Sequence, residues 1–473
     1  MADEYDIVLI IPNPSTAKGI NDTTHEQLLG ILYIGTLLNK KGFKCKIIDA
    51  KVLGLTNRDI MDRLNTHKPK LVGITFNSVC YKSIKDLCEK IKGSNMGIKI
   101  ILGGPHPTAL PIETLETFKT DAIVVGEGEL TFSEIANNLK NKRELFKNVN
   151  GVYYKTNGKT RINPPRQMNQ DIESLPFPDH SMLPNPKLYK RRTKKVPATP
   201  ILTSRGCPYR CTFCSKDVYK SKVVFRSPEN VIQEIEYLIN KFGFKQIDII
   251  DDNFLVNKER AKNILRLIIQ KKIDIAINLQ SGIRVDSIDE ELLRLMKKAG
   301  VYRVAFGVES GDKDILQRIK KDISLEGVRK AVKLTKEAGL RADCFFMIGL
   351  PGDNAKTMQR TIDFAKSLKP NTATFSITLP FPGTELYEEV KLNGLFYVDT
   401  RFGLDYGYNT ANVNYVLPGM DRKEILTYYK KAYRDFYLRP SQVLRMIMDI
   451  RSFEELKWLI DTASSVFRNI IFK

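Results

Sequence analysis

Several features that would place this chain in other protein classes are absent from its sequence. No run approaches the ~18 consecutive apolar residues that cross a bilayer, and residues 1–15 (MADEYDIVLIIPNPS) lack the basic start, apolar middle and cleavage site of a secretory signal. The seven cysteines are odd in number and irregular in spacing, unlike a secreted disulfide framework. These absences favour a cytoplasmic protein whose cysteines are reduced or bound to metal.

Motifs for nucleic acids and dinucleotides are also missing. The formal net charge of +21 suits an anionic partner, but there is no zinc-finger spacing, RNA-binding aromatic signature or regular basic repeat. The densest basic run, KLYKRRTKKV (187–196), is typical of a solvated linker. No G-x-G-x-x-G opens a helix after the first apolar run, which argues against a dinucleotide site. We therefore expect no nucleic-acid partner.

The N-terminal third alternates short apolar runs with amphipathic stretches such as residues 26–42. The apolar runs are 6–12, 45–50, 71–76, 98–104 and 121–128. Strands that are apolar on both faces, separated by helices, are typical of a parallel sheet with helices on both sides. Residues 1–145 are thus predicted to form a Rossmann-like, doubly wound α/β domain.

The remainder of the chain divides into three parts. Eight prolines between residues 164 and 200 indicate an extended connector over 146–198. Six apolar runs, each followed by a helical pattern, then predict a partial (β/α)6 barrel over 199–390, with its chemistry at the carboxyl ends of the strands. These runs are 201–204, 246–251, 276–281, 303–310, 344–349 and 372–379. Residues 391–473 are predicted to be mainly helical, and their apolar and basic end would either pack on the barrel or lie on a membrane surface.

The stretch TSRGCPYRCTFCS gathers Cys207, Cys211 and Cys214 in a C-x3-C-x2-C pattern. Three thiolates can hold three corners of a [4Fe-4S] cluster, which normally takes four protein sulfurs, so one iron would stay open. A structural zinc site would need a fourth ligand, and no nearby His or Cys supplies it. The pattern therefore favours a cluster with one open iron. The other four cysteines, Cys45, Cys80, Cys88 and Cys344, are expected to fill cores.

With Phe213 before the last cysteine, this pattern resembles the radical S-adenosylmethionine superfamily. In that family the open iron is chelated by the amino and carboxylate groups of S-adenosylmethionine, and electron transfer from the cluster yields a 5′-deoxyadenosyl radical. The resemblance implies further contacts to this cofactor at the strand ends. They are Asp251 and Asp252 (to the methionine part), Arg284 (to the carboxylate), Glu309 (to the ribose or amino group), and Gly349 and Pro351 (to the adenine side). Phe213, within the cysteine motif, is a further cofactor-binding candidate. Asp251 and Asp252 are equally typical of a helix cap.

The segments GGPHPT (103–108) and DAIVVGEGE (121–129), set before such a barrel, resemble the cobalamin-binding branch of this superfamily. The resemblance implies a cobalamin site at the strand ends of the first domain. Its candidate residues are Asn13, Thr75, Ser78, Gly103, Gly104, His106, Gly126, Glu127, Gly128 and Glu129. None of the four histidines lies in a D-x-H-x-x-G motif, so no histidine ligand to cobalt is expected, and His106 would line the pocket or serve only as a turn residue.

The resemblance implies an enzyme with three cofactors: a [4Fe-4S] cluster, S-adenosylmethionine and cobalamin. Methylation of an unactivated carbon is the expected reaction, with cyclisation or oxidation as the alternative and a non-catalytic corrinoid or iron–sulfur sensor as a contrasting function. A small-molecule or lipid substrate, such as an isoprenoid, and an electron donor such as flavodoxin or ferredoxin are expected, and contact with a membrane surface is left open. The sequence identifies no catalytic residue beyond the cofactor ligands.

Overall fold

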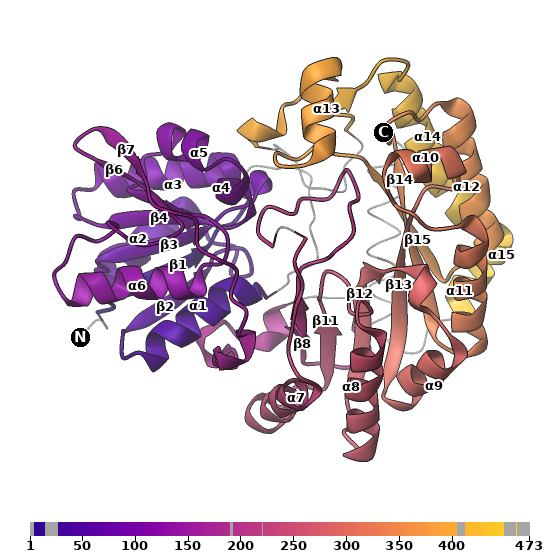
Figure 1. Cartoon of the computed structure of the whole chain (residues 1–473), viewed down its shortest axis with the longest axis horizontal. Coiled ribbons are helices and arrows are strands. Elements are labelled where there is room, and N and C mark those ends of the chain that lie inside the picture. The colour runs from indigo at the N-terminus through magenta and orange to yellow at the C-terminus, as the bar shows by residue number, and fades with distance from the viewer. Residues whose placement is uncertain are drawn as a thin grey trace. The chain divides into compact units, whose positions relative to one another are not determined.

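The computed structural model describes residues 4–14, 27–189, 193–219, 221–403, 412–448 and 460. The chain forms two compact units, one made of Met1–Lys190, Ser215–Lys220 and Asp399–Gly407, the other of Arg191–Cys214, Ser221–Val398 and Tyr408–Lys473 (Figure 1). In neither unit does a described helix have the length and apolar character that crossing a membrane requires. The apolar and basic residues of the C-terminal end, Phe453 and Trp458 among them, lie outside the described residues.

The first unit is built on a seven-stranded sheet. Its strands are β1 (Ile7–Ile11), β2 (Cys45–Asp49), β3 (Leu71–Thr75), β4 (Lys99–Gly103), β5 (Ala122–Val124), β6 (Val152–Thr156) and β7 (Lys159–Ile162). Their order in the sheet is β2-β1-β3-β4-β5-β6-β7. Strands β1 to β5 are parallel, while β6 and β7 are antiparallel. The carboxyl ends of the five parallel strands therefore share one edge.

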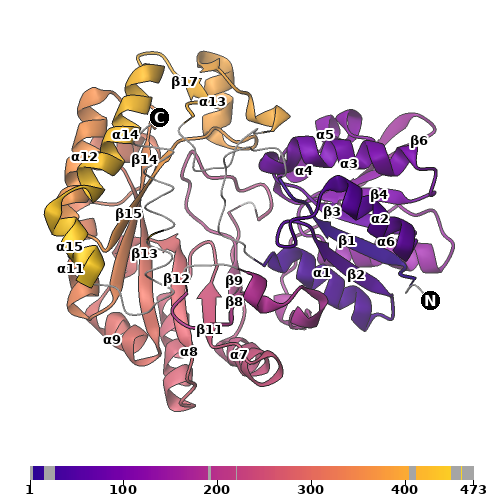
Figure 2. The ribbon, with the colours of Figure 1, turned by 180° about the vertical axis from the view of Figure 1, so that it is seen from behind.

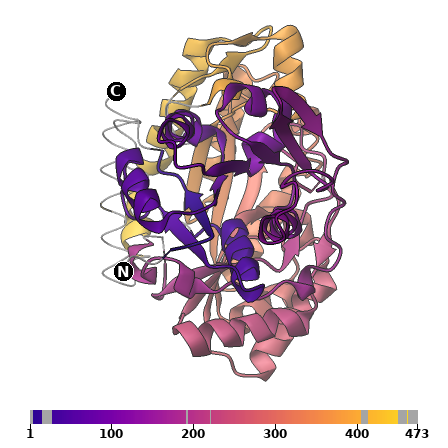
Figure 3. The same ribbon diagram turned by 90° about the vertical axis from the view of Figure 1, so that its left-hand side faces the viewer.

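Helices cover both faces of this sheet (Figure 3). They are α1 (Leu29–Lys40), α2 (Asn57–His67), α3 (Tyr81–Gly93), α4 (Pro105–Ala109), α5 (Pro111–Thr117) and α6 (Glu129–Lys140), with a 3-10 turn η1 (Ser78–Cys80). Apolar residues of α2, α3 and α5 pack on one face with the alternate residues of the strands. On the other face, Phe132 of α6 reaches so close to Gly73 that a β-carbon there would lie 2.8 Å from its ring. The predicted doubly wound α/β arrangement is confirmed.

Two strands of this sheet lie within residues 146–198, which were expected to be an extended connector. The sequence between them, Asn157-Gly158, takes positive φ values of 50° and 70°, which suits a two-residue hairpin turn. The hairpin pairs with β5 and extends the sheet. The described residues of the proline-rich part that follows form the 3-10 turns η2 (Ile172–Ser174), η3 (His180–Met182) and η4 (Pro186–Leu188).

The second unit is built on six parallel strands. They are β8 (Ala198–Ile201), β11 (Gln246–Ile249), β12 (Ala276–Ile283), β13 (Val301–Glu309), β14 (Arg341–Ile348) and β15 (Thr372–Ile377), in the order β15-β14-β13-β12-β11-β8 (Figure 2). Two short antiparallel pairs accompany them, β9 (Ser204–Arg205) with β10 (Val224–Phe225) and β16 (Leu395–Phe396) with β17 (Tyr415–Val416).

The helices of the second unit follow the strands in alternation. They are α7 (Pro228–Phe242), α8 (Lys258–Gln270), α9 (Glu290–Lys298), α10 (Lys313–Arg318), α11 (Leu325–Glu337), α12 (Ala355–Leu368), α13 (Glu385–Asn393), α14 (Arg422–Tyr437) and α15 (Pro440–Met448). The 3-10 turn η5 (Val285–Ser287) belongs to the same unit, whereas η6 (Thr400–Phe402) belongs to the first unit. Along β14, Cys344 and Phe346 are buried in the core against the helices, whereas Phe345 and Met347 are half-buried on the opposite face. A parallel sheet with helices on one face is the predicted partial barrel, and the prediction is confirmed.

Strand β8 begins at Ala198, three residues before the predicted run at 201. Pro200 lies inside it and made this stretch resemble the connector. Among the described strands, β8 lies at the edge of the sheet and pairs with β11 alone, so the missing N–H of Pro200 removes no bond to a second described strand.

Candidate functional site

The three clustered cysteines lie on a loop that follows the edge strand β8. Cys207 and Cys211 are half-buried and Cys214 is exposed. The loop is tied down at its centre, where Thr212 N–H donates to the Ile319 carbonyl (3.1 Å) and the Thr212 carbonyl accepts from Leu386 N–H (3.0 Å). Because the loop is held through backbone hydrogen bonds, its cysteine sulfurs are not needed to anchor it and are not fully buried.

The other cysteines are in a different environment. Cys45, Cys80, Cys88 and Cys344 are all buried, and burial raises the pKa of Cys80 and of Cys88 to about 12, which keeps both as thiols. No group of three or more His, Cys, Asp or Glu within the described ranges is arranged to hold a single metal ion. A [4Fe-4S] cluster does not require such an arrangement, since its cysteines bind separate iron corners. Three accessible thiols on one anchored loop fit that cluster.

Asp251 and Asp252 follow β11 and hold the strand that leads into the cysteine loop. The carboxylate of Asp251 accepts from Thr203 N–H (2.6 Å), Thr203 Oγ1 (2.5 Å) and Ser204 Oγ (2.6 Å). Asp252 accepts from Gly206 N–H at 2.8 Å, one residue before Cys207. Burial raises the pKa of Asp251 although these hydrogen bonds oppose the rise. In the described contacts, both carboxylates therefore accept hydrogen bonds from backbone N–H groups or hydroxyls of the segment that leads into the cysteine loop.

Arg284 lies at the end of β12, where the sequence predicted it. Its Nε and Nη2 donate to Asp286, with the shortest bond 2.8 Å, and its guanidinium carbon lies 3.8 Å from the centre of the Tyr209 ring. Arg284 therefore braces the cysteine loop through Tyr209.

Glu309 ends β13 and has a positive φ of 69°. Such a backbone is strained for a residue with a side chain, and strain of this kind is often found at functional sites. The Glu309 carboxylate pairs with Lys321 Nζ at 2.8 Å, and both side chains are about 10% exposed or less. Sequence reasoning missed Lys321 because it lies in the loop before α11, away from any strand end and outside the predicted motif.

Phe213 and the GLPG turn (349–352) lie on neighbouring apolar clusters. Phe213 packs against the cluster that contains Leu350 and residues of α10, and against a second cluster that contains residues of α13. Gly349 has a φ of 77°, and a β-carbon there would lie 2.9 Å from Ile425 of α14. Glycine at 349 is thus required by the turn and by packing, while Pro351 is buried in the same turn.

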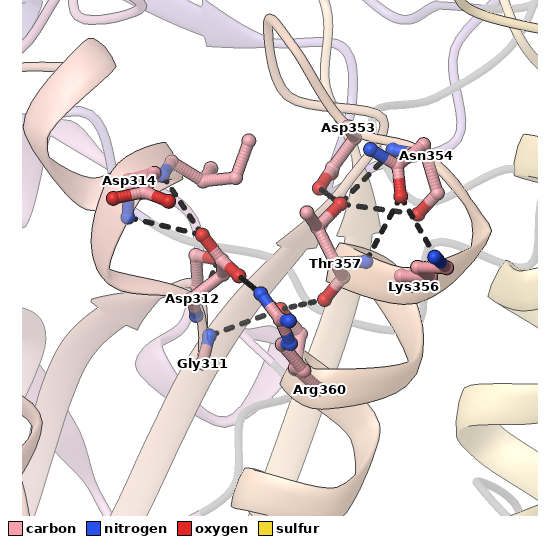
Figure 4. Close-up of polar contacts among 11 residues, drawn as sticks. Gly311, Asp312, Asp314, Asp353, Asn354, Lys356, Thr357 and Arg360 are labelled. Carbon is pink, nitrogen blue, oxygen red and sulfur yellow. Dashed lines mark hydrogen bonds and ion pairs between the residues drawn. The ribbon is translucent and has the colours of Figure 1, made fainter.

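Helix α12 anchors two of the strand ends (Figure 4). Asp353, before α12, accepts from Gly349 N–H (3.0 Å), Leu350 N–H (2.9 Å) and Thr357 Oγ1 (2.6 Å). After β13, Asp312 pairs with Arg360 of the same helix at 2.7 Å. The GLPG turn and the segment after Glu309 are thereby held in a fixed relation to each other.

In the first unit, the loops after β3 and β4 meet at His106. Its Nδ1 lies 2.9 Å from Ser78 Oγ, and its ring stacks on Phe76 with centroids 4.3 Å apart. Burial lowers the pKa of His106 to about 4, so the imidazole is neutral near pH 7. Gly104, with a φ of 105°, is needed there because a β-carbon would lie 3.0 Å from the Phe76 carbonyl oxygen and 3.2 Å from Thr75 Oγ1.

Asn77, which the sequence analysis did not single out, lies between the residues of this group. In the described part of the chain its buried Oδ1 has no hydrogen-bond partner. A buried acceptor without a partner carries a free-energy cost, so it suits a ligand that supplies an N–H donor. The peripheral amides of a corrinoid are donors of this kind, and the edge formed by Thr75, Ser78, Gly103, Gly104 and His106 therefore fits cobalamin.

The remaining cobalamin candidates do not all lie with His106. Gly126 N–H donates to Thr108 Oγ1 (3.1 Å), which joins the loop after β5 to α4. Glu127 instead accepts from Asn169 N–H (2.6 Å), and Gly128 is packed by Ile34 of α1, which would lie 2.7 Å from a β-carbon there. Asn13 donates to the Leu55 carbonyl (3.2 Å) in the loop after β2. Glu129 is buried in the first turn of α6.

A segment from late in the sequence closes on the loop after β3. Residues 399–403 belong to the first unit, and their Gly403, with a φ of 83°, packs directly on the start of α3. A β-carbon at Gly403 would lie 2.2 Å from Tyr81 Cβ and 2.9 Å from the Ser78 carbonyl oxygen. The first unit is therefore completed by residues that follow the barrel in sequence.

Both halves of the chain match known families. Residues 23–136 match the B12 binding domain, and residues 201–365 match the radical SAM superfamily.

Similar proteins extend the comparison to the whole chain. The uncharacterized methyltransferase PH0819 of Pyrococcus horikoshii is 35% identical over 450 residues, which cover 94% of this chain and 95% of that protein. The cytidylyl-2-hydroxyethylphosphonate methyltransferase of Streptomyces wedmorensis is 27% identical, with 92% and 90% covered. An anaerobic magnesium-protoporphyrin IX monomethyl ester cyclase of Rubrivivax gelatinosus is also 27% identical, with 86% and 73% covered.

Two solved structures share the fold. The cobalamin-dependent S-adenosylmethionine radical enzyme OxsB aligns with a TM-score of 0.75 at 19% identity, over 98% of this chain and 71% of that one. The radical S-adenosylmethionine methyltransferase TsrM of Kitasatospora setae aligns with a TM-score of 0.71 at 18% identity, over 92% of this chain and 90% of that one.

Proposed function

Because this chain belongs to the cobalamin-binding branch of the radical S-adenosylmethionine superfamily, we propose that it transfers a methyl group to an unactivated carbon of its substrate. The observation that carries the proposal is the presence of two different strand-end sites in one chain. One is the anchored three-cysteine loop with its charged neighbours. The other is the glycine- and hydroxyl-lined edge around His106. The methyltransferase relatives support the same reaction.

We propose that each of the two sheets carries the binding site for different cofactors. Residues 1–145 bind cobalamin, and the hairpin β6–β7 within 146–198 extends their sheet before the proline-rich remainder of that segment. Residues 199–390 form the barrel that holds the cluster and S-adenosylmethionine, and the described helices α14 and α15 follow it. When bound, the cluster and S-adenosylmethionine supply a 5′-deoxyadenosyl radical and cobalamin supplies the methyl group. The protein's share is to bind and orient these groups.

The roles we propose for the cluster side follow from the contacts. Cys207, Cys211 and Cys214 bind the cluster, and Asp251 and Asp252 hold the entry to their loop at Thr203 and Gly206. Asp353 fixes the GLPG turn against which the adenine side of S-adenosylmethionine would lie.

On the cobalamin side, we propose that the neutral His106 lines the pocket together with Thr75, Ser78 and Gly104, and that Asn77 accepts a hydrogen bond from the corrinoid periphery. Neutral, small and hydroxyl groups allow a large amide-rimmed ligand to approach the backbone without an unpaired buried charge.

Cyclisation or oxidation is the second candidate, because anaerobic cyclases are among the similar proteins. In either case we propose a cytoplasmic enzyme with a small-molecule or lipid substrate and a flavodoxin or ferredoxin as electron donor. The test is anaerobic incubation of the cluster- and cobalamin-loaded protein with a reductant and S-adenosylmethionine labelled in its methyl group. Methyl transfer predicts 5′-deoxyadenosine together with label in the corrinoid fraction. 5′-Deoxyadenosine without label there favours cyclisation or oxidation, and neither product indicates a sensor.

A further inference from the structure

The last strand of the second sheet has one side without a strand partner. Among the described strands, β15 pairs with β14 alone. An edge strand presents a row of backbone N–H and C=O groups that could pair with another chain. When such groups are buried, they carry a free-energy cost unless they find hydrogen-bond partners. Ala373 and Phe375 are fully buried, so their outward groups need partners other than a strand.

Two tyrosine hydroxyls of helix α14, which lies beside β15, provide these partners (Figure 2). Tyr433 OH donates to the Phe375 carbonyl (2.9 Å) and accepts from the Phe375 N–H (3.3 Å). Tyr437 OH donates to the Ala373 carbonyl (2.8 Å) and accepts from the Ala373 N–H (3.2 Å). Because a hydroxyl both donates and accepts, each tyrosine completes both backbone groups of one residue, as a neighbouring strand would.

The spacing of these contacts matches a helix to a strand. The two tyrosines are four residues apart, and Phe375 and Ala373 are two residues apart. Four helical residues rise about 6.0 Å and two strand residues about 6.6 Å, so both contacts can form at once. The helix runs opposite to the strand, and Gln442 of α15 continues the series through a hydrogen bond from its Nε2 to the Asn371 carbonyl (3.1 Å). These contacts together set the position of α14 along β15.

At its other end, α14 contacts the GLPG turn. Ile425 lies about two helical turns before Tyr433, and both side chains are buried. A β-carbon at Gly349 would lie 2.9 Å from Ile425, so the helix packs directly on the turn. Tyr415 of β17 holds the same residue, since its hydroxyl donates to the Gly349 carbonyl at 2.7 Å. A shift of α14 along β15 would therefore press Ile425 against the turn or withdraw it.

We infer that α14 takes the place of a seventh strand at the edge of this sheet, and that Tyr433 and Tyr437 are positioning residues for the GLPG turn. Their hydroxyls complete the outward groups of β15 without a further strand. The register that they set also holds Ile425 against Gly349. The C-terminal helix is thus part of the framework of the strand-end site, and this inference does not depend on the reaction that the enzyme performs.

Hydrogen–deuterium exchange of the full chain, resolved to single amides by mass spectrometry, tests the two contacts separately. In Y433F we expect exchange of the Phe375 amide to become about tenfold faster, and in Y437F that of the Ala373 amide, because each variant loses one hydrogen bond of the edge. Tyr429 provides the matched control. It is fully buried on the same helix, and within the described residues its hydroxyl has no hydrogen-bond partner. Y429F should change both rates by less than about twofold.

The Y433F/Y437F variant tests the positioning role. The Gly349 and Leu350 amides, which donate to Asp353, should exchange at least about threefold faster because the helix that packs on their turn is no longer held in register. The Ile247 amide belongs to β11, which pairs with a strand on each side, and should keep its rate.

An equal rise at Ile247 would overturn the inference, because it would indicate a general loss of stability instead of a local one. Faster exchange at Ala373 and Phe375 with unchanged rates at Gly349 and Leu350 would also overturn it, since the edge and the turn would then be independent. Rates in Y433F and Y437F that equal those of Y429F would contradict it as well, because the rings would then cover the edge without their hydroxyls. If the double variant does not fold, the single variants, which each keep one hydroxyl, carry the same comparison of Gly349 with Ile247.

Discussion

The surroundings of His106 in the first unit and the strand ends of the second unit differ in charge. Around His106 the first unit presents glycines, hydroxyls, aromatic rings and an imidazole whose pKa burial lowers to about 4. The second unit presents buried charges at the corresponding place, among them Asp251, Lys321 and Asp353. Both edges come from parallel α/β sheets, so the topology does not account for the difference.

This difference in charge indicates which kind of ligand each edge can bind. A buried charge has a large free-energy cost unless it is paired or hydrogen-bonded, so a charged edge implies either internal partners or a charged ligand. At the second edge the charged groups have internal partners, since Asp251 accepts from Thr203 and Lys321 donates to Glu309. The neutral surroundings of His106 suit a ligand that is bound by backbone approach and amide contacts.

The largest expected effect is the loss of the cluster from the second unit without any loss of cobalamin binding by the first. Replacing Cys207, Cys211 or Cys214 by Ala should abolish cluster assembly and 5′-deoxyadenosine formation but leave cobalamin binding in place. Iron and sulfide content, product analysis and titration with hydroxocobalamin measure these outcomes. C344A, at a buried cysteine of β14, is the control that keeps the cluster. A loop variant that still cleaves S-adenosylmethionine would contradict the ligand assignment.

Asp251 and Asp252 provide a graded test of the charged edge. Asp251 accepts three hydrogen bonds and Asp252 accepts one that is described. D251N should lower the free energy of unfolding by about 3 kcal/mol, because its amide cannot accept from all three donors, and D252N by about 1 kcal/mol. Anaerobic urea titration measures both. Equal losses at the two positions would show that Asp251 does not hold the loop.

The two edges should also respond to pH with opposite signs. Burial lowers the pKa of His106 from 6.5 to about 4, so the unfolded chain binds the proton more tightly between these values. Stability should therefore fall as the pH drops through this window, by up to about 3 kcal/mol.

Burial raises the pKa of Asp353 from 3.8 to about 6, although hydrogen bonds from Thr357, Leu350 and Gly349 oppose the rise. Here the folded chain binds the proton more tightly, so stability should rise by about 3 kcal/mol as the pH falls from 6 to 3.8. Unfolding titrations of H106Q and D353N, each subtracted from the wild type at every pH, isolate the two contributions. If the two contributions to stability change with pH in the same direction, the proposed contrast between His106 and Asp353 is wrong.

The smallest expected difference between two compared variants concerns the segment that closes on the first unit. G403A combines a positive φ with a clash against Tyr81 and should cost about 2 kcal/mol. Gly419 has a similar φ of 84° but nothing within 4 Å of its β-carbon position, so G419A should cost only about 1 kcal/mol. Thermal unfolding of the two variants measures the difference. If the two variants lose the same stability, the contact of Gly403 with Tyr81 contributes nothing.

Sequence periodicity predicted both sheets because their central strands are apolar on the helix-covered faces, as Ile74 and Phe346 are. It missed β6 and β7, whose side chains are half-exposed or exposed outside Val152 and which depend on pairing with β5. It placed the start of β8 too late because Pro200 resembles a breaker unless the strand is known to be at the edge.

The candidate-site residues that could be predicted are those that form a motif within a short stretch of sequence. Cys207, Cys211 and Cys214 were found from spacing alone. The partner of a carboxylate is not encoded in spacing, so the contacts of Asp251 to Thr203 and of Glu309 to Lys321 could be found only in the fold. The family resemblance implies a carboxylate-binding role for Arg284, while its contacts to the Lys321 carbonyl and to Asp286 could be found only in the structure.

The most direct test of the central claim is an electron paramagnetic resonance spectrum of the reduced, cluster-loaded protein with and without S-adenosylmethionine. An iron corner left open by Cys207, Cys211 and Cys214 predicts that the cofactor changes the cluster signal and that 5′-deoxyadenosine then accumulates. A signal that the cofactor leaves unchanged, from a cluster with four cysteine sulfurs, would contradict the account.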